Sequence, residues 1–114
     1  MIIKEYFKDS EISCFCGCGL MPDTESIERL YALRLLITVP LKVNSGARCE
    51  KHNKAVGGVP GSAHLIGAFD VAVPKDYRWR FLELAQFAGF TGIGISKKFI
   101  HIDRHHNQPK VWTY

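Results

Sequence analysis

Two short segments of the sequence carry side chains that are able to bind one metal ion together. Residues 62–70 (SAHLIGAFD) place His64 and Asp70 within a single turn, and residues 99–103 (FIHID) place a second histidine, His101, near the C-terminus. Three protein ligands with a fourth position left to water are the usual composition of a catalytic zinc site. We therefore interpret His64, Asp70 and His101 as candidate metal ligands.

Alternation within two predicted strands indicates how these side chains are positioned. Because successive side chains of a strand point to opposite faces, His101 and Asp103 share one face, and the two isoleucines of residues 99–103 point into the core. Asp70 opens an apolar strand, where a carboxylate is costly to bury unless it is paired or binds a metal. Taken alone, His101 and Asp103 are also compatible with two polar residues on a half-solvated sheet.

Hydrophobic periodicity and turn residues indicate the surrounding elements. Residues 22–25 (PDTE) offer an N-cap and early acidic residues to an amphipathic helix that Pro40 limits. Gly89 is placed to cap a second helix over residues 77–88, in which Trp79 is expected to supply an apolar contact. A short helix is predicted at 50–56, and strands are predicted at 41–45, 69–73, 92–95, 99–103 and 111–114. This order predicts an α+β fold, a small antiparallel sheet with flanking helices, in one domain of residues 1–114.

Composition places the chain among ordinary globular proteins. Its 114 residues are 46% hydrophobic and 23% charged, which argues against disorder. The net charge of +4 suits an anionic partner such as nucleic acid or an acidic cell-wall polymer, and equally a soluble surface with a few extra lysines. No apolar run approaches the ~20 residues that span a bilayer. Residues 1–6 lack the apolar core of a signal peptide, so we expect synthesis in the cytoplasm without an ordinary export signal.

Four cysteines leave three interpretations open. Cys14, Cys16 and Cys18 alternate with other residues, and Cys49 lies well apart from them. A structural zinc site with four thiolates is one interpretation, although ligand cysteines are usually separated by two to four residues. A disulfide is not the default without an export signal. Free thiols that pack as small apolar groups are the third interpretation.

Five ordered motifs resemble those of the zinc D-Ala-D-Ala carboxypeptidases. The motifs are residues 45–48 (SGAR), 56–58 (VGG), 62–67 (SAHLIG), 92–94 (GIG) and 99–103 (FIHID). That group is related to murein endopeptidases, lysostaphin-type peptidases and the hedgehog signalling domain. The chain is most similar to small phage-encoded members, which also carry a cysteine- and glycine-rich N-terminal segment. The resemblance covers nearly the whole chain.

The resemblance implies a zinc peptidase and assigns roles to particular residues. His64, Asp70 and His101 would bind Zn²⁺. Arg48 would bind a carbonyl or the terminal carboxylate of a peptide, for which its planar guanidinium is suited. Ser62 would lie at the rim as a hydrogen-bond donor. The implied substrate is the stem peptide of peptidoglycan, cut as a carboxypeptidase or an endopeptidase would cut it, which fits a phage lysin that acts on the bacterial cell wall. We expect a monomer with no nucleic-acid partner and no membrane insertion.

Two departures from the family pattern bear on the site. The pattern has six residues between its first two ligands, whereas five separate His64 from Asp70, so either the loop absorbs the deletion or Asp70 is displaced. Several relatives carry an acidic general base three positions before the last ligand, where this chain has Lys98. Asp103 is then the candidate for the base or for a residue that orients a ligand. His106 is an alternative third ligand, because Asp103 and His106 have the family's Asp-x-x-His spacing.

Two other classes of function compete with the peptidase. The shortened turn would suit a non-catalytic binding module of the same fold. The positive charge and the cysteines would suit a nucleic-acid-binding protein, but the lysines and arginines are scattered rather than clustered with aromatic residues. His52 and His105 are expected to be solvated, although His105 or His106 could take part in proton transfer.

Overall fold

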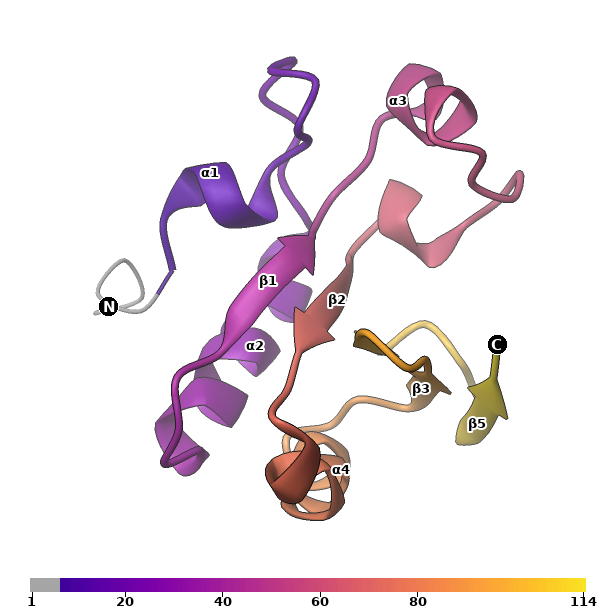
Figure 1. The fold of residues 1–114 in the computed structure, drawn as a ribbon. Helices are drawn as coiled ribbons and strands as arrows, with labels where there is room; N and C mark the ends of the chain where they lie inside the picture. Colours follow the sequence, from indigo (N-terminus) through magenta and orange to yellow (C-terminus); the bar gives the residue numbers. More distant parts are fainter. Residues whose placement is uncertain (1–6) are drawn as a thin grey trace.

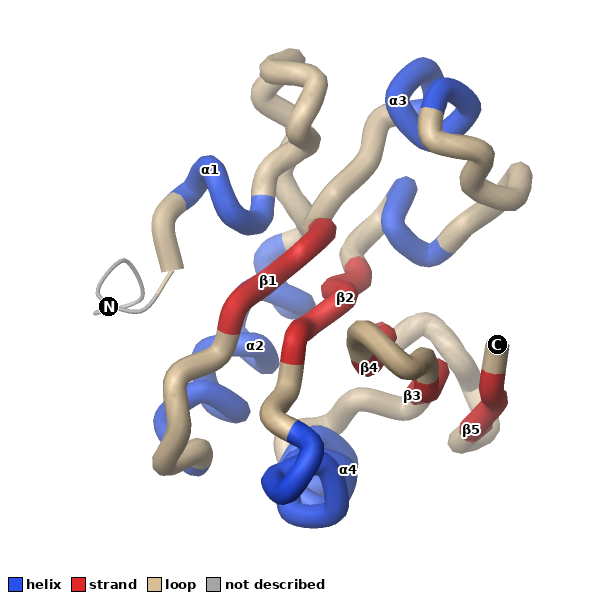
Figure 2. Tube along the Cα trace, in the orientation of Figure 1, coloured by secondary structure: helices blue, strands red, loops and turns tan. Residues whose placement is uncertain are grey.

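A five-stranded sheet organises the chain in the computed structural model, which describes residues 7–114 (Figure 1). Residues 1–6, to which the expectation about a signal peptide refers, lie outside the described part. The strands are β1 (Lys42–Ser45), β2 (Ala68–Ala72), β3 (Gly92–Ile95), β4 (Ile100–Asp103) and β5 (Lys110–Thr113). Their order across the sheet is β1-β2-β4-β3-β5, which can be followed in Figure 2. The predicted α+β class is therefore confirmed.

The sheet is mixed, which corrects the expectation that it is wholly antiparallel. β1 with β2, β2 with β4, and β3 with β4 pair antiparallel, but β5 pairs parallel with β3. The physical reason is that β5 does not pair with β4, the strand before it in the sequence. The chain instead passes to the far side of β3, which already runs opposite to β4. The pattern of residues 111–114 predicts a strand but carries no signal for its neighbour.

Two helices cover one face of the sheet and enclose the core. Helix α2 (Thr24–Leu36) is capped by Asp23, whose side chain accepts a hydrogen bond from the backbone N–H of Ser26. Helix α4 (Arg78–Phe87) follows a short 3-10 helix, Lys75–Tyr77, and contacts α2. The core contains Leu30 and Leu33 of α2, Phe81, Leu84 and Ala85 of α4, and Val43, Phe69, Val71, Ile93, Ile100 and Ile102 of the sheet.

Trp79 does not pack in this core as the sequence analysis expects. Its side chain is 79% exposed, and Phe81 is fully buried in its place. Phe81, Leu84, Ala85 and Ala88 share one stripe at three- and four-residue spacing, which is the stripe that faces the sheet. Trp79 lies outside that stripe. Gly89 follows the helix with a φ of 98°, as predicted for its cap.

Shorter segments lie beside β1 and at the start of β2, and Ile12 of the first of them packs in the core just described. Helix α1 (Asp9–Ile12) contacts β1, and helix α3 (Glu50–Ala55) contacts a 3-10 helix, Ala63–Leu65, that leads into β2. Figure 1 shows these segments at the upper end of β1 and β2. None of the helices within residues 7–114 has the length and apolar character needed to cross a bilayer. The short segments and the sheet enclose the region that holds the predicted metal ligands.

Candidate metal centre

The register of β2 and β4 places two of the predicted ligands opposite each other. Asp70 and His101 are partners across the antiparallel pair, and both side chains point away from the core. Nδ1 of His101 lies 2.9 Å from Oδ1 of Asp70. The core residues on either side, Phe69 with Ile102 and Val71 with Ile100, are fully buried. A slip of one residue would bury the charged pair and expose these apolar side chains, so the core enforces the ligand geometry.

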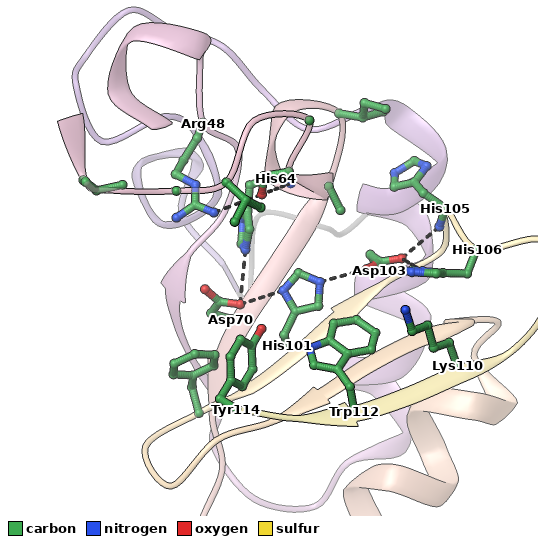
Figure 3. A pocket seen from close by; sticks show the side chains of 18 of the residues that line it. Arg48, His64, Asp70, His101, Asp103, His105, His106, Lys110, Trp112 and Tyr114 are labelled. Carbon is green, nitrogen blue, oxygen red and sulfur yellow. Dashed lines mark hydrogen bonds and ion pairs between the residues drawn. The ribbon is translucent and has the colours of Figure 1, made fainter. Parts of the chain in front are cut away.

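His64 completes the cluster from the 3-10 helix before β2. Its Nε2 lies 3.2 Å from the same Oδ1 of Asp70, and the ligand atoms of His64, Asp70 and His101 all lie within 4.8 Å of one another (Figure 3). The five-residue spacing between His64 and Asp70 therefore does not displace Asp70, because the compact 3-10 turn followed by Gly67 spans it. His106 is not in this group.

A backbone carbonyl fixes the orientation of the His64 ring. Nδ1 of His64 lies 2.6 Å from the carbonyl oxygen of Gly46, which can only accept a hydrogen bond, so Nδ1 carries the proton and Nε2 is left to bind a metal. The side chain is 2% exposed. A second contact, from the Arg48 N–H to the His64 carbonyl at 2.8 Å, holds the two segments together. Residues 46–48 thus position His64.

Asp103 lies behind His101 and faces its second ring nitrogen. Oδ2 of Asp103 is 2.8 Å from Nε2 of His101, and Oδ1 accepts hydrogen bonds from the backbone N–H of His105 and from Nδ1 of His106. The carboxylate is fully buried. Of the two roles left open for Asp103, this geometry favours the orientation of His101. An acceptor at Nε2 leaves Nδ1, the nitrogen beside Asp70, for the metal.

The cluster opens into a cleft of about 740 Å³. Arg48 and Ser62, both predicted site residues, lie in its wall, with Nη2 of Arg48 donating to Oγ of Ser62 at 3.2 Å. Nε of Arg48 is buried and has no hydrogen-bond partner in the described part of the chain. The glycine-containing loop of residues 56–61 forms part of the same wall. Arg48 therefore places a guanidinium group with one unpaired N–H in the wall beside the candidate ligands.

Two aromatic residues, Trp112 of β5 and Tyr114 directly after it, also line the cleft, although the sequence does not identify them as site residues. The Trp112 ring lies 5.4 Å from that of His101 and 5.5 Å from that of His106, and Tyr114 packs on Phe99 at 5.4 Å. Trp112 pairs with Gly94, where an added Cβ would meet the indole at 2.5 Å. The alternation of Trp112 and Tyr114 places both on one face, and the position of β5 beside β3 places that face against the site.

The charges of the cluster suit a divalent cation. Burial would lower the pKa of His101, but hydrogen bonds to Asp103 and Asp70 raise that pKa to about 9. Burial would also raise the pKa of Asp70, but the hydrogen bond from His101, together with the neighbouring His64 ring, holds that pKa well below its usual range. Asp103 behaves similarly, with a pKa lowered to about 2 against the effect of burial. Two carboxylates thus flank a proton on His101, and a metal ion can replace that proton.

These shifts predict how pH changes the stability of the metal-free protein. His101 has a higher pKa in the folded state than its ordinary 6.5, so its stabilisation is complete below pH 6.5 and is lost as the pH rises through about 9. The lowered pKa values of Asp70 and Asp103 act in the opposite sense, and their stabilisation is lost as the pH falls below 3.8. Between pH 6.5 and 9.5 we expect the free energy of unfolding to fall by on the order of 3 kcal/mol.

Urea denaturation in the presence of a chelator measures this dependence. The matched control is His101→Gln, which keeps hydrogen-bonding groups but does not titrate, and in which the decrease should be absent. A stability profile that is the same in both proteins over this pH range would contradict the role of His101.

Two imidazoles and one carboxylate that converge beside an open cleft are a donor set found in catalytic zinc sites, including those of metal-dependent peptidases. The family model described as Peptidase M15 matches residues 5–103, so the chain belongs to the peptidase M15 family. The match includes His64, Asp70, His101, Arg48, Ser62 and Asp103. No curated protein sequence matches the chain significantly. Peptidases of this family are zinc-dependent, and the His64, Asp70 and His101 cluster offers the donor set that zinc requires.

Proposed function

We propose that this protein hydrolyses a peptide bond next to the C-terminal carboxylate of a peptidoglycan stem peptide, at the bacterial cell wall. The observation that carries the proposal is Arg48, whose guanidinium lines the same cleft as the candidate zinc ligands and has one buried, unpartnered N–H. A planar guanidinium pairs with a carboxylate through two hydrogen bonds. An arginine beside a hydrolytic centre therefore favours a short peptide with a free C-terminus.

The protein's own residues would orient the substrate and the ligands. When bound, Zn²⁺ supplies Lewis acidity, which polarises a carbonyl group and acidifies water. Arg48 holds the carboxylate of the peptide, and Ser62 Oγ keeps the guanidinium in place at 3.2 Å. Gly46 and Asp103 fix the rings of His64 and His101. Ligands that are already oriented need little reorganisation during the reaction.

The aromatic residues and His106 would complete the site. Trp112 and Tyr114 form an apolar wall that suits small side chains such as the methyl group of D-Ala. We assign proton transfer to the leaving amine to His106, which lines the cleft and whose Nδ1 is held 2.8 Å from Asp103, leaving Nε2 to exchange the proton. A displaced Asp70 would favour a non-catalytic module. Asp70 is not displaced, because its Oδ1 lies 3.2 Å from Nε2 of His64.

Substitution of Arg48 tests the proposal. With a stem pentapeptide that ends in D-Ala-D-Ala, we expect Arg48→Ala to lower kcat/KM by ~10²-fold, since a hydrogen bond to a charged group contributes about 1.5–3 kcal/mol. Amidation of the peptide's C-terminus should lower the wild-type value similarly. The two changes together should cost little more than either alone, because both remove the same interaction. Product analysis by liquid chromatography and mass spectrometry gives the rates and the cleaved bond.

The control variant is Arg80→Ala, which removes an exposed arginine of α4 that pairs with Glu83 on the surface. Its kcat/KM should equal that of the wild type. Cleavage of the amidated peptide at the full rate would exclude carboxylate recognition and favour an endopeptidase. Failure of the zinc-loaded protein to cleave either peptide would overturn the proposed substrate.

A further inference from the structure

The four cysteines gather at a second place in the molecule, away from the cleft. We propose that Cys14, Cys16, Cys18 and Cys49 bind a structural Zn²⁺ through four thiolate sulfurs. Their Sγ atoms all lie within 4.8 Å of one another, although Cys49 is far from the other three in the sequence. None of the four is exposed to the cleft that holds His64, Asp70 and His101.

Three of the distances between the sulfurs match those of a tetrahedral zinc site. Sγ of Cys14 lies 3.4 Å from that of Cys16 and 3.8 Å from that of Cys49, and the Cys16 and Cys49 sulfurs are 3.7 Å apart. With Zn–S bonds of about 2.3 Å, the edge of a tetrahedron of sulfurs is about 3.8 Å. A disulfide would require about 2.05 Å, and all four cysteines are free. The geometry thus fits a shared cation rather than a covalent pair.

The backbone explains how alternate residues can supply three ligands to one point. In a strand Cys14, Cys16 and Cys18 would share a face but lie in a line, too widely spaced for a single ion. Here Gly17 and Gly19 adopt φ values of 83° and 87°, which curl the segment. The Gly17 N–H donates to the Cys14 carbonyl at 3.2 Å, and the Cys14 N–H donates to the Leu20 carbonyl at 2.8 Å. The turn therefore directs the sulfurs inward.

Backbone N–H groups also point at the sulfurs. The N–H of Cys49 donates to Sγ of Cys14 at 3.4 Å, and the N–H of His52 donates to Sγ of Cys49 at 3.3 Å. Such donors stabilise the negative charge of a thiolate, which is the form that binds a metal. Two of the four sulfurs are therefore already supported as anions by the chain that carries them.

The cysteine cluster joins the N-terminal segment to the residues that position the cleft. The Ala47 N–H donates to the Ile12 carbonyl at 2.8 Å, and Gly46 lies so close to Ile12 that a Cβ would clash with its backbone. The loop after α1 thus lies beside the chain that leads from β1 to α3 (Figure 1). Because Cys49 directly follows Arg48, a metal at this cluster would anchor the segment that holds both Arg48 and the Gly46 carbonyl.

Metal analysis and cobalt spectroscopy test the proposal without any activity measurement. Protein purified under reducing conditions should contain two zinc ions per chain. The His101→Ala variant should contain one, and so should Cys49→Ser. After replacement of zinc by Co²⁺, the wild type and His101→Ala should show intense sulfur-to-cobalt charge-transfer absorption, and Cys49→Ser should not. His52→Ala is the control, because His52 contributes only its backbone N–H to the cluster, and it should keep both ions and the absorption.

Three results would overturn the proposal. The first is a wild type with a single zinc that His101→Ala removes, and the second is a cobalt-loaded wild type without charge-transfer absorption. The third is the loss of the absorption in His52→Ala together with its retention in Cys18→Ser. That result would mean that the His52 imidazole, and not the Cys18 thiolate, is the fourth ligand. If Cys49→Ser fails to fold, Cys18→Ser is the milder variant, because Cys18 is exposed. The cobalt spectrum of the wild type then still shows whether thiolates bind the metal. Since no outcome depends on peptide cleavage, failure of the proposed function would leave this test unaffected.

Discussion

Replacement of His64 by alanine is expected to abolish metal binding at the cleft and to lower peptide hydrolysis by at least ~10³-fold. The size follows from the several kcal/mol of transition-state stabilisation that a catalytic metal supplies. Only Asp70 and His101 would remain as protein ligands, and two ligands do not hold zinc in a structural or catalytic site. Elemental analysis gives the zinc content and cleavage of the stem peptide gives the rate.

The control for this experiment is His52→Ala, the same substitution at a histidine outside the cleft. Because His64 is buried and its loss also removes the hydrogen bond to Gly46, the fold of the variant must be checked. Circular dichroism should show that His64→Ala retains its secondary structure. Zinc held by the cysteines must be counted separately, so the expected change is the loss of one ion and not of all metal. A His64→Ala protein with wild-type activity would refute the metal centre.

The Asp103→Asn variant is expected to bind zinc about 10–100-fold more weakly, as is usual when the partner of a ligating histidine is altered. The substitution preserves shape but removes the negative charge that accepts hydrogen bonds from His101, His105 and His106. Its amide can no longer accept at both positions, so the tautomer of His101 that presents Nδ1 to the metal loses its support. Titration of the metal-free protein with zinc measures the affinity.

The activity of Asp103→Asn at high zinc concentration separates the two roles considered for this residue. A residue that orients His101 affects catalysis mainly through metal occupancy, so excess zinc should restore most of kcat. A general base would leave kcat low even when the site is saturated. Asp76→Asn, on the exposed 3-10 helix before α4, is the control and should match the wild type in both measurements. Unrescued activity in Asp103→Asn would contradict the orienting role.

The residues that the sequence places correctly are those with strong local signals. The alternation of residues 99–103 places Ile100 and Ile102 in the core and His101 and Asp103 on the other face, which is the arrangement in the structure. An N-cap within residues 22–25, which Asp23 provides in the structure, and the cap at Gly89 likewise follow from residue type and position. In each case the deciding interaction lies within a few residues of the chain.

The features that the sequence leaves open depend on contacts between distant segments. The approach of β5 to β3 decides that Trp112 and Tyr114 line the cleft, and no local pattern specifies that neighbour. The spacing of the cysteines argues against a common ion when it is considered along the chain alone. Positive φ angles at Gly17 and Gly19, together with the docking of Cys49, bring the sulfurs together.

The position of Asp70 and His101 on adjacent central strands has a consequence for redesign. These ligands are fixed by the core beneath them, whereas the walls of the cleft come from the loop of residues 56–61 and from edge strand β5. β5 also lies beyond residues 5–103, the part shared with the family model. Varying the loop of residues 56–61 and strand β5 is thus the natural way to change which peptide the cleft accommodates. A library that varies these two segments should yield new selectivities, while every member keeps the same metal ligands on the central strands.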